Sequence, residues 1–168
     1  MSLTTILRAA VVATLIGAAD LGTNKHEIAA EADVKLPSGT SSGRADLLFA
    51  DERSINASSS ENLDLTGGSL EDGTGAALVF AKVKAILIHA DDGNTNNVVV
   101  GNAAANPFVG PFDDGTATVA IPPGGFLFLA APAGGWTVST DSADILKVAN
   151  SGAGTAVTYR IYIIGTSA

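Results

Sequence analysis

The segment best suited to catalysis is Gly39-Thr40-Ser41-Ser42-Gly43, which matches the G-x-S-x-G pattern of a nucleophilic serine. That pattern works where a buried strand leads into a helix, because the sharp turn between them exposes the serine hydroxyl. Here the match lies in a Ser- and Gly-rich segment that begins at Pro37, and no helical pattern follows it. We interpret the segment as a loop without a catalytic role.

Two other patterns could hold a metal ion. The two histidines, His26 and His89, are separated by a distance in sequence that matches no zinc site. Residues 92–96 (Asp-Gly-Asn-Thr-Asn) place oxygen ligands at the first, third and fifth positions, as a calcium loop does. Asn97 and Ala103 then stand where an EF-hand needs glycine and a bidentate glutamate. We predict a polar turn here, with a looser calcium site as the alternative.

Acidic side chains are paired only as sequence neighbours, at 51–52, 91–92 and 113–114, and neighbours on one turn do not form an acid–base pair across a cleft. Trp136 and Tyr162 could stack on a glycan, although packing in a core or between subunits is the favoured role. We therefore predict no catalytic, cofactor or metal-binding residues and expect a protein that is not an enzyme.

Composition narrows the class of protein further. The 168 residues carry 17 acidic and 9 basic side chains, for a net charge of −8, and such a surface repels nucleic acid. The absence of cysteine excludes disulfides and thiolate sites. Hydrophobic residues make up 46% of the chain and glycine occurs 19 times, which is typical of a single domain with short strands and tight turns.

The elements that must carry these residues are predicted to be strands. Residues 144–164 form two strands around the Gly-rich turn 150–154, and in the second strand apolar and mixed side chains alternate between the two faces. The predicted apolar face comprises Val157, Tyr159, Ile161 and Ile163, and the other face Thr158, Arg160 and Tyr162. Residues 78–90 are predicted as a central strand, although their apolar positions also fit a helical stripe.

Further short strands are predicted at 47–49, 53–57, 63–65, 98–100, 116–121, 125–130 and 136–139. Asp-Gly pairs at 72–73, 92–93 and 114–115 predict type I′ hairpin turns between such strands. Many short strands at this spacing predict an all-β fold, an antiparallel, jelly-roll-like β-sandwich over residues 44–168.

Residues 1–43 are predicted to form an N-terminal arm with strands. Arg8 and the apolar run after it imitate a signal peptide that is too short to span a bilayer. We interpret the run instead as an arm packed on the body or on a neighbouring subunit, because an apolar terminus that stays ordered must be tied down. Residues 26–36 alternate like a strand, with a short helix as the alternative. The predicted assembly interface comprises Leu3, Ile6, Leu7, Val11, Val12, Leu15 and Ile16.

Several segments resemble a known family. They are Leu36–Ile55 (LPSGTSSGRADLLFADERSI), Glu61–Gly67 (ENLDLTG), Phe80–Ile86 (FAKVKAI), Ile121–Phe126 (IPPGGF) running on to Ala131-Pro132, Asp144–Gly154 (DILKVANSGAG), and Tyr159–Gly165. Together they are similar to small accessory structural proteins of tailed-bacteriophage virions. The resemblance implies a β-sandwich subunit, often trimeric, that cements or decorates a capsid or is built into a tail, and it implies no catalytic residues.

These observations together predict a capsid decoration or cement protein on the capsid surface. Its expected partners are the major capsid protein, or another virion protein, and further copies of itself in a homotrimer, without nucleic acid, membrane or cofactor. The alternative is a receptor- or glycan-binding knob of a tail or spike that uses the acidic loops 91–97 and 113–116. A secreted hydrolase or adhesin is a third possibility and requires N-terminal cleavage.

Overall fold

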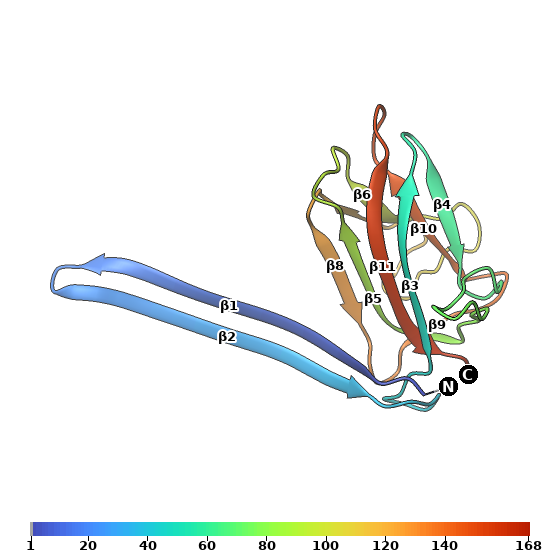
Figure 1. Ribbon diagram of the computed structural model, residues 1–168, viewed down its shortest axis with the longest axis horizontal. Coiled ribbons are helices and arrows are strands. Elements are labelled where there is room, and N and C mark those ends of the chain that lie inside the picture. Colours follow the sequence, from blue (N-terminus) through green and yellow to red (C-terminus); the bar gives the residue numbers. More distant parts are fainter. Residues whose placement is uncertain (1) are drawn as a thin grey trace.

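The computed structural model describes residues 2–168 as a long β-hairpin that projects from a β-sandwich (Figure 1). No helix occurs within that range. The strands are β1 (Thr5–Ala19), β2 (Gly22–Leu36), β3 (Leu47–Ile55), β4 (Ser60–Asp64), β5 (Lys82–Ala90), β6 (Val98–Gly101), β7 (Thr118–Ile121), β8 (Phe126–Ala130), β9 (Trp136–Thr137), β10 (Ile145–Asn150) and β11 (Val157–Thr166).

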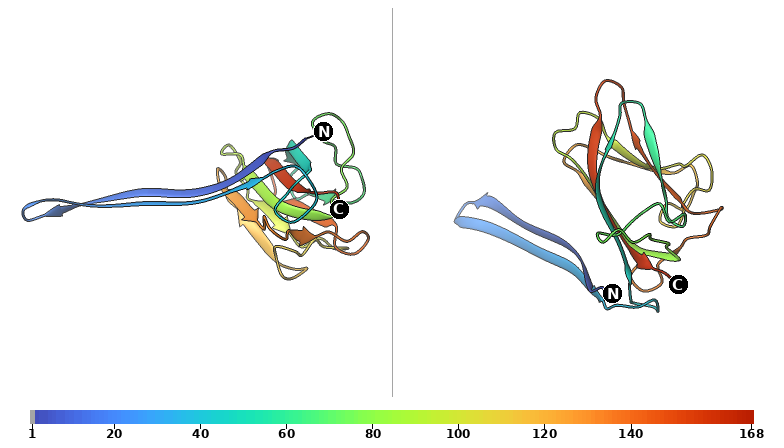
Figure 2. Two further views of the ribbon diagram at one scale, coloured as in Figure 1. Left: turned by 90° about the horizontal axis from the view of Figure 1, so that it is seen from below. Right: turned by 45° about the vertical axis from the view of Figure 1, so that its right-hand side comes forward.

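The sandwich consists of two antiparallel sheets that face each other across one core (Figure 2). One sheet has the strand order β4-β10-β6-β7, and the other has the order β3-β11-β5-β8 with β9 paired to β5. The predicted all-β, antiparallel sandwich is confirmed, and the jelly-roll connectivity stays a prediction. Residues 26–36 and 82–90 are strands rather than helices.

Strand β11 lies at the centre of the larger sheet, between β3 and β5. Its predicted alternation is confirmed, because Val157, Tyr159, Ile161 and Ile163 are all completely buried in the core between the sheets. Phe49 of β3 and Val148 of β10 contribute to the same core from the two sheets. Burial of this inner face is the main force that holds the sheets together.

The predicted hairpin at the C-terminal end is wrong, because β10 and β11 belong to different sheets. The turn at 150–154 crosses from one sheet to the other. Asn150 holds this crossing, since its amide Nδ2 donates hydrogen bonds to the carbonyl oxygens of Ile55, Asn56 and Thr155. Both strands bury an apolar face, and two such faces can meet across a core as well as lie side by side in one sheet.

The Asp-Gly prediction is also wrong, since none of the three pairs has positive φ in either residue. Each turn is instead closed by an aspartate that accepts a hydrogen bond from the backbone two residues later. Asp72 Oδ1 accepts from Thr74 N at 2.8 Å, and Asp91 Oδ1 accepts from Gly93 N at 2.9 Å. Such Asx turns use the same residues as a type I′ turn without positive φ in the Asp-Gly pair itself, and positive φ occurs instead at the nearby Gly75 and Asp113.

The strands predicted at 47–49 and 53–57 form one continuous strand, β3. The polar residues 51–54 interrupt the hydrophobic pattern, yet the backbone continues to pair with β11 through them. Among these residues, Arg53 is held by ion pairs to Asp51 and Glu61. Pairing with a neighbouring strand therefore overrides the local break in the pattern.

One polar network connects the two sheets inside the sandwich. The Tyr159 hydroxyl of β11 donates a hydrogen bond to Glu61 Oε1 of β4 at 2.8 Å, and Arg53 Nε donates to Glu61 Oε2 at 2.7 Å. Burial and then the hydrogen bond to Glu61 raise the pKa of Tyr159 above its ordinary value. The neutral phenol is therefore the form that the folded state favours.

A Tyr159→Phe variant tests this network. We expect it to lose about 1.5–3 kcal/mol of unfolding free energy at pH 7, the range for a hydrogen bond to a charged group. A phenol whose pKa is raised on folding stabilises the protein below about pH 10 and loses that contribution as the pH rises further. The gap between wild type and variant in urea unfolding is thus expected to narrow above pH 10. A constant gap would show that the phenol does not ionise differently in the two states.

Candidate functional site

The most prominent feature outside the sandwich is the hairpin of β1 and β2. Its strands pair in an unbroken antiparallel register from Thr5↔Leu36 at the root to Ala19↔Gly22 at the tip. Gly22 has a φ of 103°, a backbone conformation that favours glycine, and follows the tip residues Asp20 and Leu21. Strands of this length reach about 50 Å, so most of the hairpin stands clear of the sandwich (Figure 1).

The two faces of the hairpin differ in chemistry, because residues paired across the strands share a face. One face, here called the apolar strip, carries no charged side chain between the root and His26. The strip comprises Leu7, Ala9, Val11, Ala13 and Leu15 of β1 with Ile28, Ala30, Ala32 and Val34 of β2. The opposite face mixes apolar residues with charges such as the ion pair of Arg8 with Asp33, in which Arg8 Nε donates to Asp33 Oδ2 at 3.0 Å.

Most of the apolar strip is exposed. Val11 is 64% exposed and Leu15 is 70% exposed, and Ile28 opposite them is also open to solvent. An isolated two-stranded hairpin is only marginally stable in water and needs a third strand or a packed face for independent stability. A hairpin this long with an open apolar strip therefore has the properties of a binding element that is completed by a partner.

The root of the hairpin is fixed to the sandwich by a small apolar cluster. Leu7, only 8% exposed, joins Leu36, Ala45, Ala85 and Ile164 in this cluster. Leu3 and Phe128 pack against it from outside. The direction in which the hairpin leaves the sandwich is therefore set by packed side chains rather than by a flexible linker.

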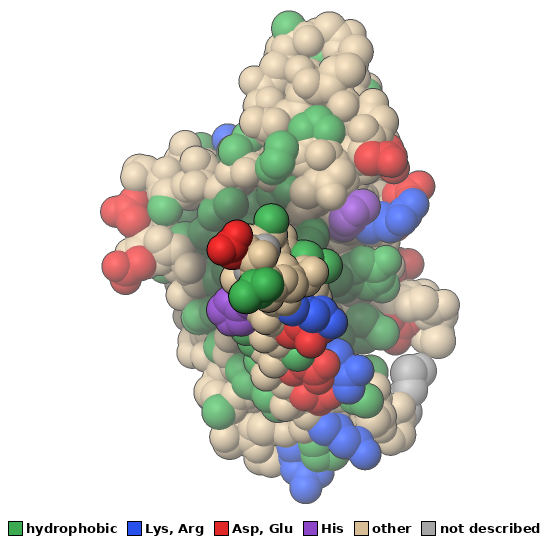
Figure 3. All heavy atoms as spheres, turned by 90° about the vertical axis from the view of Figure 1, so that its left-hand side faces the viewer, with side chains coloured by type: hydrophobic (Ala, Val, Ile, Leu, Met, Phe, Trp, Pro, Cys, Tyr) green, Lys and Arg blue, Asp and Glu red, His purple; other side chains and the backbone are tan. Residues whose placement is uncertain are grey.

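Beyond the root, the strip and the sandwich diverge and leave an open groove of about 800 Å³. The sandwich wall of this groove is the outer face of the β3-β11-β5-β8 sheet. Its apolar residues, here called the platform, are Leu48, Leu87, Phe126, Phe128 and Tyr162. Figure 3, viewed along the hairpin, shows hydrophobic side chains on the sandwich behind it and charged side chains along one side of the hairpin.

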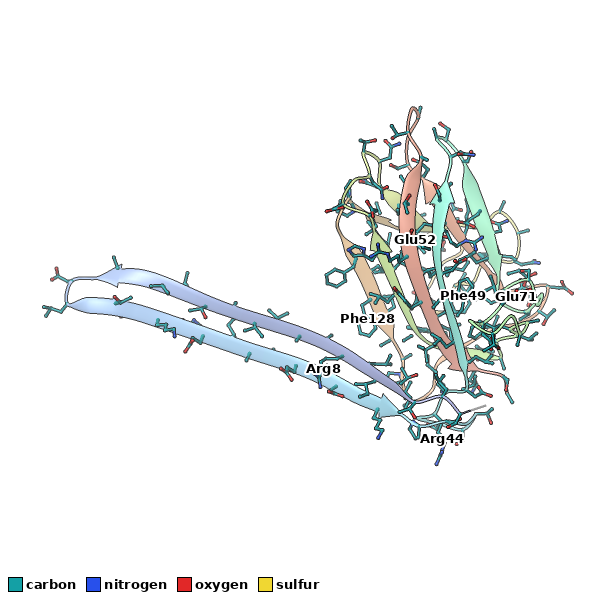
Figure 4. All side chains as sticks on the ribbon, viewed as in Figure 1. Arg8, Arg44, Phe49, Glu52, Glu71 and Phe128 are labelled. Atoms are coloured by element: carbon teal, nitrogen blue, oxygen red, sulfur yellow. The ribbon has the colours of Figure 1, made fainter. Side chains whose placement is uncertain are left out.

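A charged row bounds the platform on the side away from the root. Arg160 Nε donates a hydrogen bond to Glu52 Oε2 at 2.8 Å, and His89 lies next to Arg160 in the register. Phe126 is opposite His89 at the edge of the sheet and is 70% exposed. Figure 4 shows Glu52 above Phe128 on this sheet and Arg8 on the hairpin below them. Apart from Phe126 at the edge of the sheet, the apolar and charged residues of the outer face thus occupy different rows.

The structure separates the predicted interface residues into three groups. Leu3 and Leu7 lie at the root, against the sandwich. Val11 and Leu15 lie on the exposed strip, and Ile6, Val12 and Ile16 lie on the opposite, mixed face. Sequence reasoning missed the contribution of β2 to the strip, although the alternation of residues 26–36 carries that signal. It also missed the platform, whose residues come from four separate strands.

The other candidate residues are dispersed. Ser41 lies in the loop between β2 and β3, where its carbonyl oxygen accepts a hydrogen bond from Arg44 N at 3.1 Å. His26 lies near the tip of the hairpin, whereas His89 lies on the sandwich. Residues 2–168 contain no group of three or more His, Asp or Glu side chains placed to hold a metal ion. Trp136 and Phe112 pack against the sandwich core, while Tyr162 belongs to the platform.

In comparisons with known proteins, no family model matches this chain and no curated protein matches it significantly. The resemblance to virion proteins therefore stays a prediction. In the part of the chain that the structure describes, no helix is long and apolar enough to cross a membrane.

Proposed function

We propose that this chain is a non-enzymatic structural protein of a bacteriophage virion, a capsid decoration or cement protein that binds the major capsid protein. The observation that carries the proposal is the projecting hairpin, whose apolar strip is open over most of its length. A large exposed apolar surface is typical of a protein–protein interaction site, and an assembly subunit can use such an element to bind a neighbour. The resemblance of residues 36–165 to accessory virion proteins supports the same function.

The hairpin can bind in two ways at once. Its strip offers apolar area, and Val11, Leu15 and Ile28 are still more than half exposed, so that burial by a partner gains a large part of the about 1.5–3 kcal/mol that full burial of such a side chain is worth. Its outer strand edges offer unpaired backbone groups that a neighbouring strand can extend. Association costs roughly 4–15 kcal/mol, so one hairpin binds weakly and several hairpins on one oligomer bind firmly. The proposed trimer supplies that multivalency.

Co-sedimentation tests this function. The purified protein is mixed with capsids that are built from the major capsid protein of the same genome and lack this chain. We expect saturable binding and capsids that withstand higher temperature before they release their contents. The expected arrangement has the hairpin toward the capsid and the acidic sandwich toward solvent. Absence of binding, combined with adsorption of the protein to host cells, would contradict the decoration role and establish the receptor-binding knob.

A further inference from the structure

The platform on the sandwich matches the apolar strip of the hairpin, but in one copy most of the two surfaces stay apart. We propose that the platform receives the apolar strip of a second copy of this chain, so that neighbouring subunits exchange hairpins. The inference rests on the proposed function only in treating the protein as an assembly subunit.

At the root of the hairpin, a contact of this kind already exists within one copy. Leu7 belongs to the strip, and it packs in a buried cluster with Ala85 and Ile164 of the larger sheet. Phe128 of the platform packs against the same cluster. Ile164 and Ala85 lie in the row of the sheet next to Tyr162 and Leu87, so the root cluster and the platform form one continuous surface. The strip and this surface are therefore chemically compatible.

Within one copy, the outer part of the apolar strip does not reach the platform. Leu36 is completely buried at the root, and backbone hydrogen bonds join Gly39 N to the Ala45 carbonyl and Ala45 N to the Pro37 carbonyl. These contacts fix the hairpin at its root, and beyond the root the paired strands lead away from the sandwich. Val11 and Leu15 thus stay exposed while Phe126 and Tyr162 stay exposed on the platform. Each copy therefore presents an exposed strip and an exposed platform, and the strip of one copy can dock on the platform of another.

The distribution of charged side chains favours the apolar strip as the face of the hairpin that docks. The strip carries no ionised side chain between Leu7 and Leu15, and the platform carries none either. Docking them covers no ionised member of either surface, and the desolvation cost is confined to the edge of the platform where Phe126 shares its row with the Glu52–Arg160 ion pair. The opposite face of the hairpin carries the ion pairs Arg8–Asp33 and Lys25–Glu27 and also Glu31 and Lys35, so docking that face instead would remove all of these charges from water. Only the strip can face the platform.

The area of the platform determines how much of a hairpin it can bind. The platform residues lie in three rows of the four-stranded sheet. The root cluster occupies part of the first row and charged residues most of the third, which leaves an apolar area of about two rows, or roughly 280 Å². Each platform buries about 560 Å² in total together with the matching part of one hairpin, which is below the roughly 1,000 Å² of an independent specific interface. A single contact is therefore weak, and the exchange depends on a closed assembly in which every copy makes two such contacts. A platform of this size covers only part of a hairpin that is about 50 Å long. The remaining length is available for the capsid protein, so hairpin exchange and capsid binding are compatible.

Cysteine trapping tests the exchange, because the natural chain contains no cysteine. One preparation carries Leu15→Cys on the strip, and a second, with a larger tag, carries Tyr162→Cys on the platform. The two preparations are mixed, unfolded and refolded together, and oxidised. A disulfide between chains of different size is intermolecular by design. The matched control replaces Leu15→Cys by Ile16→Cys, which lies on the opposite face of the same strand.

We expect the Leu15→Cys pair to yield at least about tenfold more mixed disulfide than the Ile16→Cys pair, since a disulfide needs Cβ atoms about 4 Å apart. An Ala13→Cys copy mixed with a Leu87→Cys copy provides a second pair in case one variant folds poorly, since Ala13 is two residues from Leu15 on the strip and Leu87 is the register partner of Tyr162. Native mass of the unmodified protein must also show an oligomer. Equal yields with the control, or a protein that remains a single copy at the concentrations used, would overturn the exchange.

Failure of the exchange and failure of the decoration role have different signatures. A single-copy protein that binds capsids leaves the proposed function intact and removes the exchange. An oligomer with strip-to-platform disulfides that does not bind capsids establishes the exchange and removes the decoration role.

Discussion

Shortening the hairpin is expected to abolish capsid binding while the sandwich stays folded. The variant lacks residues 9–32 and joins Arg8 to Asp33, which are paired in the register, through an Asn-Gly turn that suits a two-residue hairpin. It keeps Leu7 and Leu36, so the root cluster is preserved. The sandwich core contains no residue of the deleted segment, and its melting temperature is expected to change by less than about 4 °C, the shift that follows from ~1 kcal/mol.

The measurements are the fraction of protein that sediments with capsids and the native mass of the free protein. Both are expected to fall, the first to background and the second to a single copy. A matched pair of full-length variants separates the two faces of the hairpin. Val11→Asp with Leu15→Asp places charges on the strip and is expected to act like the deletion, whereas Val12→Asp with Ile16→Asp changes the opposite face and is expected to retain binding. A shortened protein that still saturates capsids would refute the role of the hairpin.

Truncating the centre of the core is expected to give the largest loss of stability. Ile161 is completely buried in β11, with Asp51 and Ile88 as its register partners on the two sides. Ile161→Ala removes three carbon atoms from a site enclosed by both sheets, and the cavity cannot close without moving a strand. We expect a loss of about 2–5 kcal/mol in the free energy of unfolding, measured with urea.

The neighbouring residue supplies the control. Tyr162 lies one position further along β11 and therefore points to the outer face, where it is 39% exposed on the platform. Tyr162→Ala is expected to cost less than about 1 kcal/mol in the unfolding of a single copy, because partly exposed sites lose little contact. It is expected to weaken association between copies instead. Similar losses from both variants in urea unfolding would show that the two faces of β11 are not distinguished as we describe.

The amino-acid sequence by itself determines the strands and the faces they bury. In β11, apolar residues at every second position place Val157 to Ile163 on one side of any sheet, whatever the neighbouring strands are. The same alternation in residues 26–36 identifies a strand with one apolar face. Local pattern is sufficient here because the side chains of a strand alternate with a period of two in every sheet.

Only the tertiary structure decides which strands pair and what their faces meet. The turn at 150–154 has the composition of a hairpin, yet β10 and β11 pack in opposite sheets. The platform draws Leu48, Leu87, Phe126 and Tyr162 from four strands, and nothing near any one of them in the sequence indicates that they are neighbours. Pairing and packing depend on contacts between residues far apart in the chain, and an alternating strand satisfies its own pattern equally well beside many partners. The exposed strip follows from the same cause: the sequence makes the hairpin amphipathic, while the packing of its root turns it away from its own sandwich.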